Sequence, residues 1–208
     1  MVFAESAPVF YYDLGSPECY LAAERVNAVL PAAPDWQPVL GKWESSRAED
    51  SLSGEDSPGA GDLRPVCRDL GAGRSEFERV ARGAGLQPVR WPARWPPSSE
   101  SALRAAIYAK SIGRVTAFSL AAFRQVFAAG RDLADVDTVV IAAAACEMHP
   151  SAVVKALALR SVARSLDEAT ANAVAAGVRR LPSVTVGELV FEGDAGLERA
   201  AAELMSRA

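Results

Sequence analysis

The sequence predicts an α/β protein with a βαβ unit at the start, a helical segment in the middle and a ββα unit at the end. Residues 9–40 change from an extended apolar run to a helical run and back to an extended run. The middle of the chain is rich in alanine, with turn-forming residues at helix-length intervals. Residues 183–205 change period again, to two short extended runs and a final helix.

Composition is that of a globular protein with one sizeable core. The 208 residues are long for one minimal domain and short for two independent ones. A net charge of −4 with scattered basic residues gives no reason to expect a nucleic-acid partner. Residues 1–6 lack the features of a signal peptide and no apolar run could cross a bilayer, so we expect a cytoplasmic protein without a membrane partner.

Cysteine and histidine usage excludes two further classes of site. The three cysteines are odd in number and far apart in sequence, which favours reduced thiols over a disulfide framework. One histidine and no Cys/His cluster give no reason to expect a metal site. We expect Cys19, Cys67 and Cys146 to be core thiols, and His149 to cap a helix or to lie on the surface.

The βαβ unit is predicted from the first forty residues. Val9–Tyr12 forms the first strand, and Pro17 suits the first position of a helix that extends to Leu30. The second strand is predicted at 35–41, near a sheet edge or with a bulge, because Pro38 cannot donate to the ladder. The polar, acidic residues 44–64 are then predicted to form a loop, which could be a lid or only slack.

The middle of the chain is predicted to be all helical. Gly113, Gly130 and Gly177 would end helices, and Asp135 and Asp167 would start them. The predicted helices cover residues 74–83, 99–112, 115–129, 136–147, 150–164 and 167–176. The tryptophans Trp43, Trp91 and Trp95 could line an apolar pocket or only pack between the two parts of the chain.

The ββα unit has strands at 183–187 and 188–191, joined by a tight turn at Gly187, and a helix at 194–205. The chain therefore divides into a split α/β domain, residues 1–65 and 165–208, and a helical insertion, residues 66–164.

Ser16 stands where the first strand turns into the first helix. It suits the N-cap position, where its hydroxyl lies beside unpaired backbone N–H groups and the positive end of the helix. Such a place stabilises an anion, including a thiolate. A purely structural cap is the commoner role of a serine in this context.

Three segments together resemble a known family. Tyr11-Tyr12-Asp13-Leu14-Gly15-Ser16-Pro17-Glu18-Cys19-Tyr20 is similar to its aromatic–Asp–x–x–Ser-Pro–x–x–aromatic opening. Gly177-Val178-Arg179-Arg180-Leu181-Pro182-Ser183 is similar to its Gly-Val-x-Gly-Val-Pro-Thr segment, and Phe191-Glu192-Gly193-Asp194 to a segment that ends in Asp at the last helix start. With the βαβ–insertion–ββα plan, the chain resembles the DsbA-like branch of the thioredoxin fold, and most of all 2-hydroxychromene-2-carboxylate isomerases and kappa-class glutathione transferases.

The resemblance implies a glutathione-dependent isomerase or transferase that acts on an aromatic or electrophilic metabolite. Glutathione or a related small thiol would place its sulfur at Ser16, the catalytic residue. Leu181, before a cis Pro182, would pair with the cofactor's peptide, and Asp194 would accept from its γ-glutamyl ammonium. Family members are often homodimers, so a homodimer is a further expectation.

Two other functions stay open beside this one. Disulfide oxidoreductases of the same fold carry Cys-x-x-Cys where this chain has Ser16 and Cys19, and a hydroxyl cannot form the mixed disulfide that exchange requires. A non-catalytic binding protein is the third reading. It is supported by Arg179 and Arg180, which replace small residues before Leu181 and could either grip a cofactor carboxylate or crowd the site.

Overall fold

The computed structural model describes residues 7–42, 63–65 and 70–207. Trp43 and Cys67, and most of the predicted loop at 44–64, lie outside the described residues. The elements are β1 (Val9–Tyr12), α1 (Pro17–Val29), β2 (Asp35–Pro38), β3 (Arg64–Pro65), α2 (Leu70–Gly83), α3 (Glu100–Ser111), α4 (Val115–Phe127), α5 (Val136–Ala144), α6 (Pro150–Ala158), α7 (Arg160–Ala175), β4 (Arg180–Leu181), β5 (Ser183–Val186), β6 (Leu189–Glu192) and α8 (Gly196–Arg207).

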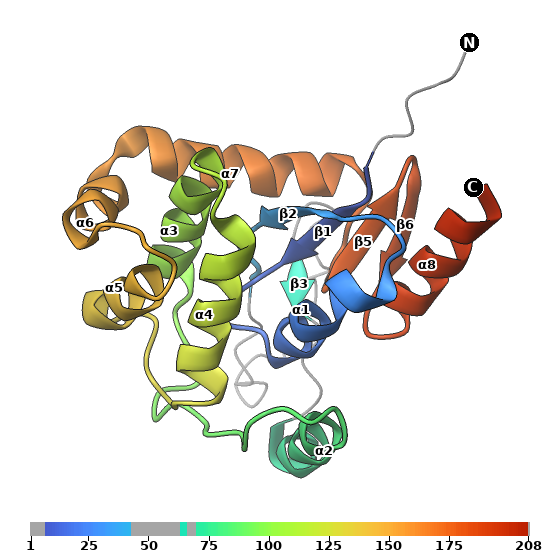
Figure 1. Cartoon of the computed structure of the whole chain (residues 1–208), viewed down its shortest axis with the longest axis horizontal. Helices are drawn as coiled ribbons and strands as arrows, with labels where there is room; N and C mark the ends of the chain where they lie inside the picture. Colours follow the sequence, from blue (N-terminus) through green and yellow to red (C-terminus); the bar gives the residue numbers. More distant parts are fainter. Residues whose placement is uncertain (1–6, 43–62, 66–69, 208) are drawn as a thin grey trace, which may run out of the picture.

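A mixed sheet with the strand order β2-β1-β5-β6 forms the centre of the molecule (Figure 1). β1 runs parallel to β2, with Phe10 opposite Trp36, and antiparallel to β5, with Phe10 opposite Val184. β5 and β6 form the predicted hairpin, and Gly187 turns it with a positive φ of 60°. Pro38 is the last residue of the edge strand β2, as its missing N–H requires.

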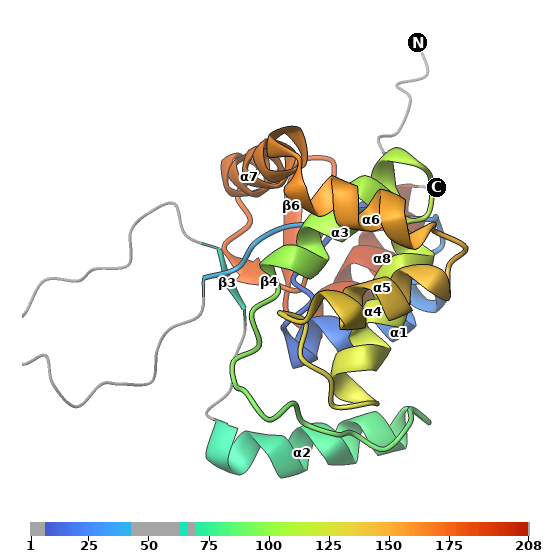
Figure 2. The same ribbon diagram turned by 90° about the vertical axis from the view of Figure 1, so that its left-hand side faces the viewer.

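Helices cover both faces of this sheet. α1 and α8 lie side by side against one face, and α7 crosses the other (Figures 1 and 2). Phe10 and Tyr12 are two residues apart in β1 and so point to the same face. Their rings stack on each other with centroids 5.3 Å apart, and the Trp36 ring meets both edge-on. The core of the α/β unit therefore contains an aromatic cluster on this face of the sheet.

The helices α3 to α6 pack together beside the sheet, as the predicted insertion requires (Figure 1). Phe118, Phe123 and Phe127 of α4 are completely buried and form the apolar face of this helix. Tyr12 of β1 and Ser119 of α4 share a buried hydrogen bond of 2.6 Å between their hydroxyl oxygens. A polar contact thus joins the sheet to the insertion inside an otherwise apolar interface.

The helix α2 lies apart from the other helices, at one end of the molecule (Figure 2). Phe77 of α2 packs against Trp91 and Phe127, at centroid distances of 5.4 and 6.1 Å. Trp91 also meets Trp95 edge-on at 5.1 Å, and both indoles are half-buried. These two tryptophans therefore hold the segment between α2 and α3 against the helical bundle.

One predicted helix boundary is wrong. The sequence placed it between 164 and 167, with Asp167 as the start, whereas α6 ends at Ala158 and α7 begins at Arg160. Leu159 interrupts the helix with an extended backbone, φ −77° and ψ 124°, and Asp167 lies inside α7. No glycine or proline marks the break at 159, and the helices on both sides of it, α6 and α7, contact α3.

The other boundaries differ from the prediction by a few residues, as frayed helix ends commonly do. The predicted markers are otherwise confirmed: Asp135 caps α5 by accepting from the Asp137 N–H, and His149 caps α6 by accepting from the Ser151 N–H. Gly113, Gly130 and Gly177 follow helices with positive φ.

The small sheet of β3 and β4 was not predicted. β3 runs parallel to β4, with Arg64 opposite Arg180 and Pro65 opposite Leu181. The two strands have two residues each, so neither has the length at which a sequence pattern becomes visible.

The α/β class with a helical insertion is confirmed, since βαβ and ββα units flank the inserted helices. The predicted division at residues 164 and 165 falls inside α7, and the division into two domains stays a prediction. Among the described residues, no helix is both long and apolar enough to span a membrane.

Candidate active site at the start of α1

Ser16 is the N-cap of α1, as the sequence predicted. Its backbone is extended, with φ −89° and ψ 123°, and its Oγ accepts from the Cys19 N–H at 3.2 Å. Pro17 follows at the first helical position, and the Ser16 N–H donates to the Asp13 carbonyl at 3.1 Å. The turn from β1 into α1 is therefore closed by hydrogen bonds on both sides of Ser16.

The Ser16 hydroxyl is not open to solvent. The residue is completely buried, and its hydroxyl donates to Oε2 of Glu18 at 3.3 Å. A Cβ on the neighbouring Gly15 would lie 3.3 Å from the Pro97 carbonyl oxygen, so the segment before α3 covers this turn closely. Because Glu18 already accepts the Ser16 proton, donation of this hydroxyl to a ligand sulfur would require the contact with Glu18 to break.

Cys19 is a buried thiol, as expected. Its side chain is completely buried and faces away from solvent, under the start of α1. Burial is the main cause that raises the pKa of the Cys19 thiol, and hydrogen bonds with Ser16 and with the Asp13 backbone only partly oppose it. A thiol in this state is a poor nucleophile, because the thiolate is the reactive form.

Asp13 lies beneath the same turn and is completely buried. Its carboxylate accepts from the Gly15 N–H at 2.7 Å and from the Gly41 N–H at 2.8 Å, and Ser99 donates to it. The contact with Gly15 is local, since that residue lies two positions further along the chain. The contacts to Gly41 and Ser99 also tie the end of β1 to the residues after β2 and to the start of α3. Burial raises the pKa of Asp13, while these three donors oppose the rise.

The Leu181–Pro182 peptide bond is cis, as the family resemblance implied. Leu181 is completely buried and lies opposite Pro65 in the β3–β4 ladder. The Pro182 carbonyl accepts from the Gly193 N–H at 2.8 Å, which joins this strand entry to the residues before α8. The chain's own strand β3 therefore occupies the edge at which we expected a cofactor peptide to pair.

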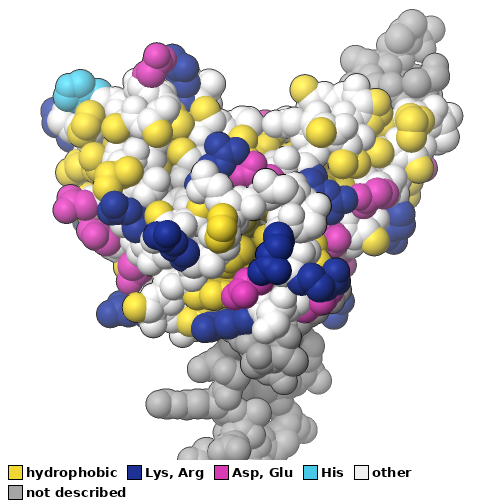
Figure 3. Space-filling model, turned by 60° about the horizontal axis from the view of Figure 1, so that its bottom comes forward, with side chains coloured by type: hydrophobic (Ala, Val, Ile, Leu, Met, Phe, Trp, Pro, Cys, Tyr) yellow, Lys and Arg dark blue, Asp and Glu magenta, His cyan; other side chains and the backbone are white. Residues whose placement is uncertain are grey.

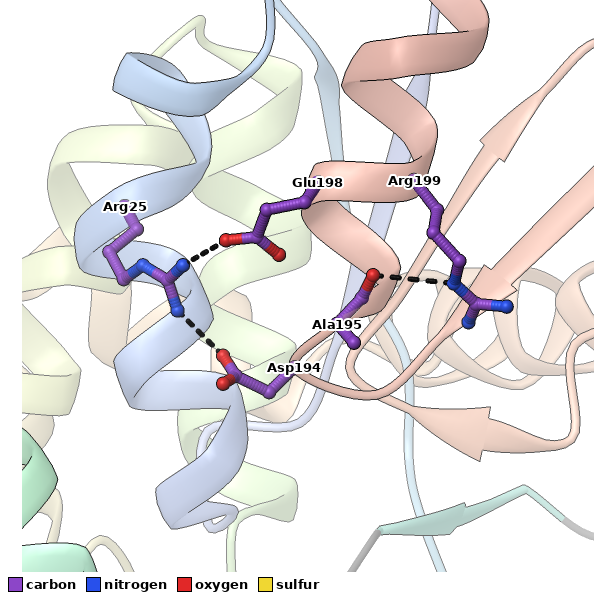
Figure 4. Close-up of polar contacts among 5 residues, drawn as sticks. All are labelled: Arg25, Asp194, Ala195, Glu198 and Arg199. Atoms are coloured by element: carbon purple, nitrogen blue, oxygen red, sulfur yellow. Dashed lines mark hydrogen bonds and ion pairs between the residues drawn. The ribbon is translucent and has the colours of Figure 1, made fainter.

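Asp194 lies just before α8 and pairs with Arg25 of α1 (Figure 4). The Arg25 Nη1 atom is 2.7 Å from Oδ1 of Asp194, and Nη2 of the same guanidinium pairs with Glu198. Arg199 points to the other side of α8, where it donates to the Ala195 carbonyl at 3.3 Å (Figure 4). The side chain of Asp194 is 56 % exposed, so an external ammonium could reach it in competition with Arg25.

The two arginines before Leu181 have different roles. Arg179 donates from Nη1 to the carbonyls of Val174 and Val178, at 2.6 and 2.8 Å, and so satisfies the end of α7. Arg180 is exposed, and its backbone N–H donates to Oε1 of Glu192 at 2.9 Å. Both arginines are exposed, and the Arg179 guanidinium is bonded to backbone carbonyls at the end of α7.

Each group predicted to bind the cofactor is thus engaged by the chain itself. Glu18 holds the Ser16 hydroxyl, β3 pairs with Leu181, and Arg25 pairs with Asp194. Sequence reasoning missed these partners. Glu18 had a visible signal, since an acidic residue in the first turn of a helix is placed to meet its N-cap. The pairing of Arg25 with Asp194 had none, since 169 residues separate them.

The face that carries α2 has apolar side chains at its centre and Lys and Arg side chains around them (Figure 3). Arg74 of α2 lies over the rings of Trp91 and Trp95, at 4.9 and 5.7 Å from their centroids. Trp91 also donates from Nε1 to Glu78 at 2.8 Å. These contacts support the packing role of the two tryptophans.

Within the described part of the chain, no group of His, Cys, Asp and Glu side chains is placed to bind a metal ion.

Three features together define a thioredoxin-fold protein. They are a four-stranded sheet with helices on both faces, a first helix that has a serine as its N-cap, and a cis proline at a strand entry. The chain belongs to the DSBA-like thioredoxin domain family, whose model matches residues 9–205. No protein of curated function matches the sequence.

Solved structures of this fold resemble the chain over nearly its full length. A 2-hydroxychromene-2-carboxylate isomerase has a TM-score of 0.70 and 19 % identity, over 97 % of this chain and 95 % of its own. A probable DsbA oxidoreductase from Streptomyces coelicolor has a TM-score of 0.71 and 18 % identity, over 97 % and 91 %. The cytosolic disulfide reductase DsbM from Pseudomonas aeruginosa, solved with GSH, has a TM-score of 0.59 and 14 % identity, over 97 % and 98 %. At these identities the likeness establishes the fold alone.

Proposed function

We propose that the protein is a glutathione-dependent or related small-thiol-dependent isomerase or transferase, which acts in the cytoplasm on an aromatic or electrophilic metabolite. The observation that carries the proposal is the serine N-cap at the start of α1, with a buried Cys19 three residues later. The positive end of a helix lowers the free energy of a charged sulfur, and the Ser16 hydroxyl would turn from Glu18 to donate to it. The bound sulfur would add to the substrate and leave again, or stay attached to it.

The same site gives the cofactor its remaining contacts. Leu181 would offer its backbone to the cofactor's peptide and Asp194 its carboxylate to the γ-glutamyl ammonium. Binding at these positions requires that the ligand displace β3 from Leu181 and Arg25 from Asp194. Both replaced contacts are small: β3 has two residues, and the ion pair is partly exposed. A solved relative of the same fold is described with GSH, which supports this choice of thiol.

Calorimetry with glutathione on the wild type and on Ser16→Ala tests the proposal. We expect the wild type to bind and the variant to bind about tenfold more weakly, since a hydrogen bond to a charged or polarised sulfur contributes about 1.5 kcal/mol. Thermal unfolding in parallel measures the loss of the cap, about 1 kcal/mol. If no glutathione or related thiol binds the wild type, or Ser16→Ala binds it equally well, the proposal fails.

The burial of Ser16 favours a second candidate, a non-catalytic thioredoxin-fold binding protein. In that case the hydroxyl would serve only as a cap, and the calorimetric titration with thiols would show no heat of binding at any concentration.

A third candidate, disulfide exchange, is opposed by the serine and by the buried Cys19. An insulin-reduction assay on the wild type separates it, with Ser16→Cys as the positive control because that change recreates a Cys-x-x-Cys pair.

A further inference from the structure

Arginines surround the two tryptophans that hold the segment before α3 against the bundle. The Arg74 guanidinium of α2 lies over the rings of Trp91 and Trp95, at 4.9 and 5.7 Å from their centroids. Arg90 and Arg94 each come directly before one of these tryptophans in the chain, and both are exposed. The half-buried indoles therefore have cations on more than one side.

A further arginine joins this cluster from the residues after α4. The Arg90 N–H donates to the Phe127 carbonyl at 2.8 Å, and a Cβ on Gly130 would lie 3.3 Å from the Cβ of Arg90. Arg131 follows Gly130 directly and is exposed. We name this surface the Arg–Trp patch, which consists of Arg74, Arg90, Trp91, Arg94, Trp95 and Arg131.

Three arginines of the patch lack an acidic partner. Within the described part of the chain, no carboxylate forms an ion pair with Arg90, Arg94 or Arg131. In contrast, both Nε and Nη2 of Arg124, on α4, are 2.8 Å from the carboxylate of Glu24. The whole chain has a net charge of −4, so the patch is a local excess of positive charge on an acidic protein (Figure 3).

We propose that the Arg–Trp patch binds an acidic segment of a partner protein, with an apolar side chain of that segment against the indoles. Charge complementarity carries the inference, because carboxylates would supply the counter-charges that the exposed arginines lack. Tryptophan and arginine are also the residues that contribute most to binding at protein interfaces. The inference is independent of the proposed function, since the patch contains no residue assigned to the thiol.

Other occupants fit this surface less well. A second copy of the chain in a two-fold contact would place arginines against arginines. A membrane surface would need large apolar side chains to insert, and none of those that are exposed among the described residues belongs to the patch. A nucleic acid would be repelled by the rest of an acidic protein, because it carries its charge over a long distance.

Fluorescence anisotropy of a labelled acidic peptide on the full chain tests the proposal. The probe is fluorescein-labelled Glu-Glu-Phe-Leu-Glu-Glu, and labelled Gln-Gln-Phe-Leu-Gln-Gln is the uncharged comparison. We expect only the acidic peptide to bind. Its affinity should fall several-fold between about 0.01 M and about 0.15 M salt, since the screening length decreases from about 30 Å to about 8 Å.

Two double charge reversals show where the peptide binds. Arg94→Glu/Arg131→Glu reverses two charges of the patch, and we expect about tenfold weaker binding. Lys155→Glu/Arg160→Glu is the matched control, because it changes the net charge equally on α6 and α7, at the end of the molecule opposite α2 (Figure 2). It should bind the peptide as tightly as the wild type. All four replaced side chains are exposed, so both variants should keep the wild-type unfolding midpoint.

Several results would overturn the proposal. They are no binding of the acidic peptide at about 1 mM, equal binding of the uncharged peptide, and equal loss of affinity in the two double variants. Oligo-dT and phosphatidylserine vesicles are titrated in parallel. If either binds more tightly than the peptide and is lost in Arg94→Glu/Arg131→Glu, the patch binds a nucleic acid or a membrane instead. A dimer that sedimentation detects in the wild type but not in this variant would assign the patch to a second copy.

Discussion

The guanidinium of Arg25 in α1 lies 2.7 Å from the carboxylate of Asp194, just before α8, and so joins two helices that are far apart in the sequence. The same guanidinium also pairs with Glu198 (Figure 4). The contact gives Asp194 a cationic partner of its own, in the place where the family resemblance expects the ammonium of a cofactor. Its consequence is competition between an internal cation and an external one.

Replacing Arg25 should therefore strengthen glutathione binding. In Arg25→Gln, Asp194 loses its internal partner, and we expect the affinity to rise up to about fivefold, since a partly exposed ion pair contributes at most about 1 kcal/mol. Asp194→Asn should lower the affinity. N-acetylated glutathione is the control ligand, since it lacks the ammonium and should bind the wild type and Arg25→Gln equally. An equal gain for both ligands would show that Asp194 does not contact the ammonium.

Loss of the buried hydroxyl pair between Tyr12 and Ser119 should destabilise the protein. Tyr12→Phe leaves the Ser119 hydroxyl buried without its partner, and we expect about 1–3 kcal/mol lower free energy of unfolding. Tyr12→Phe/Ser119→Ala should cost less than the sum of the two single changes. Urea unfolding measures all three. Tyr108→Phe on α3, where the tyrosine is only half-buried, is the matched control with an expected change near zero. Additive single changes would argue against a coupled pair.

Asp13 should make stability depend on pH. Burial raises its pKa in the folded state above the unfolded value of about 3.9. A carboxyl with a raised folded pKa contributes its full stability below the unfolded pKa and loses that contribution as the pH rises through the folded pKa. The free energy of unfolding of the wild type, minus that of Asp13→Asn, should therefore fall as the pH rises above about 4, by at most about 1.4 kcal/mol per pH unit. Urea unfolding at several pH values measures the difference, and a rise with pH would contradict the direction of the shift.

Gly196 should not tolerate a side chain. A Cβ at this first residue of α8 would lie 2.8 Å from the carbonyl oxygen of Phe191, and that backbone can move only together with β6. We expect Gly196→Ala to lower the free energy of unfolding by about 1–3 kcal/mol. Gly83→Ala, at the end of α2 with no atom within 4 Å of its Cβ, is the control and should be neutral or slightly stabilising. Equal unfolding midpoints for the two variants would show that α8 shifts without cost.

Local signals in the sequence were sufficient for much of the fold. The change of period at Val9–Tyr12 and at 183–191 predicted the strands, because alternation and β-branched residues are visible within a few residues. Ser16, Asp135 and His149 could be predicted as caps, since a cap acts on N–H groups only two or three residues away.

Only the tertiary structure decided the state of the candidate site. The burial of Ser16, the pairing of Leu181 with β3 and the ion pair of Asp194 with Arg25 all depend on segments that meet through folding. The break between α6 and α7 at Leu159 was likewise not visible in the sequence, because no glycine or proline marks it. The sequence by itself determined which chemical groups stand at the ends of the elements. Contacts between residues more than a hundred positions apart decided which of those groups face solvent and which are already bonded. Such contacts leave no periodic pattern in the sequence.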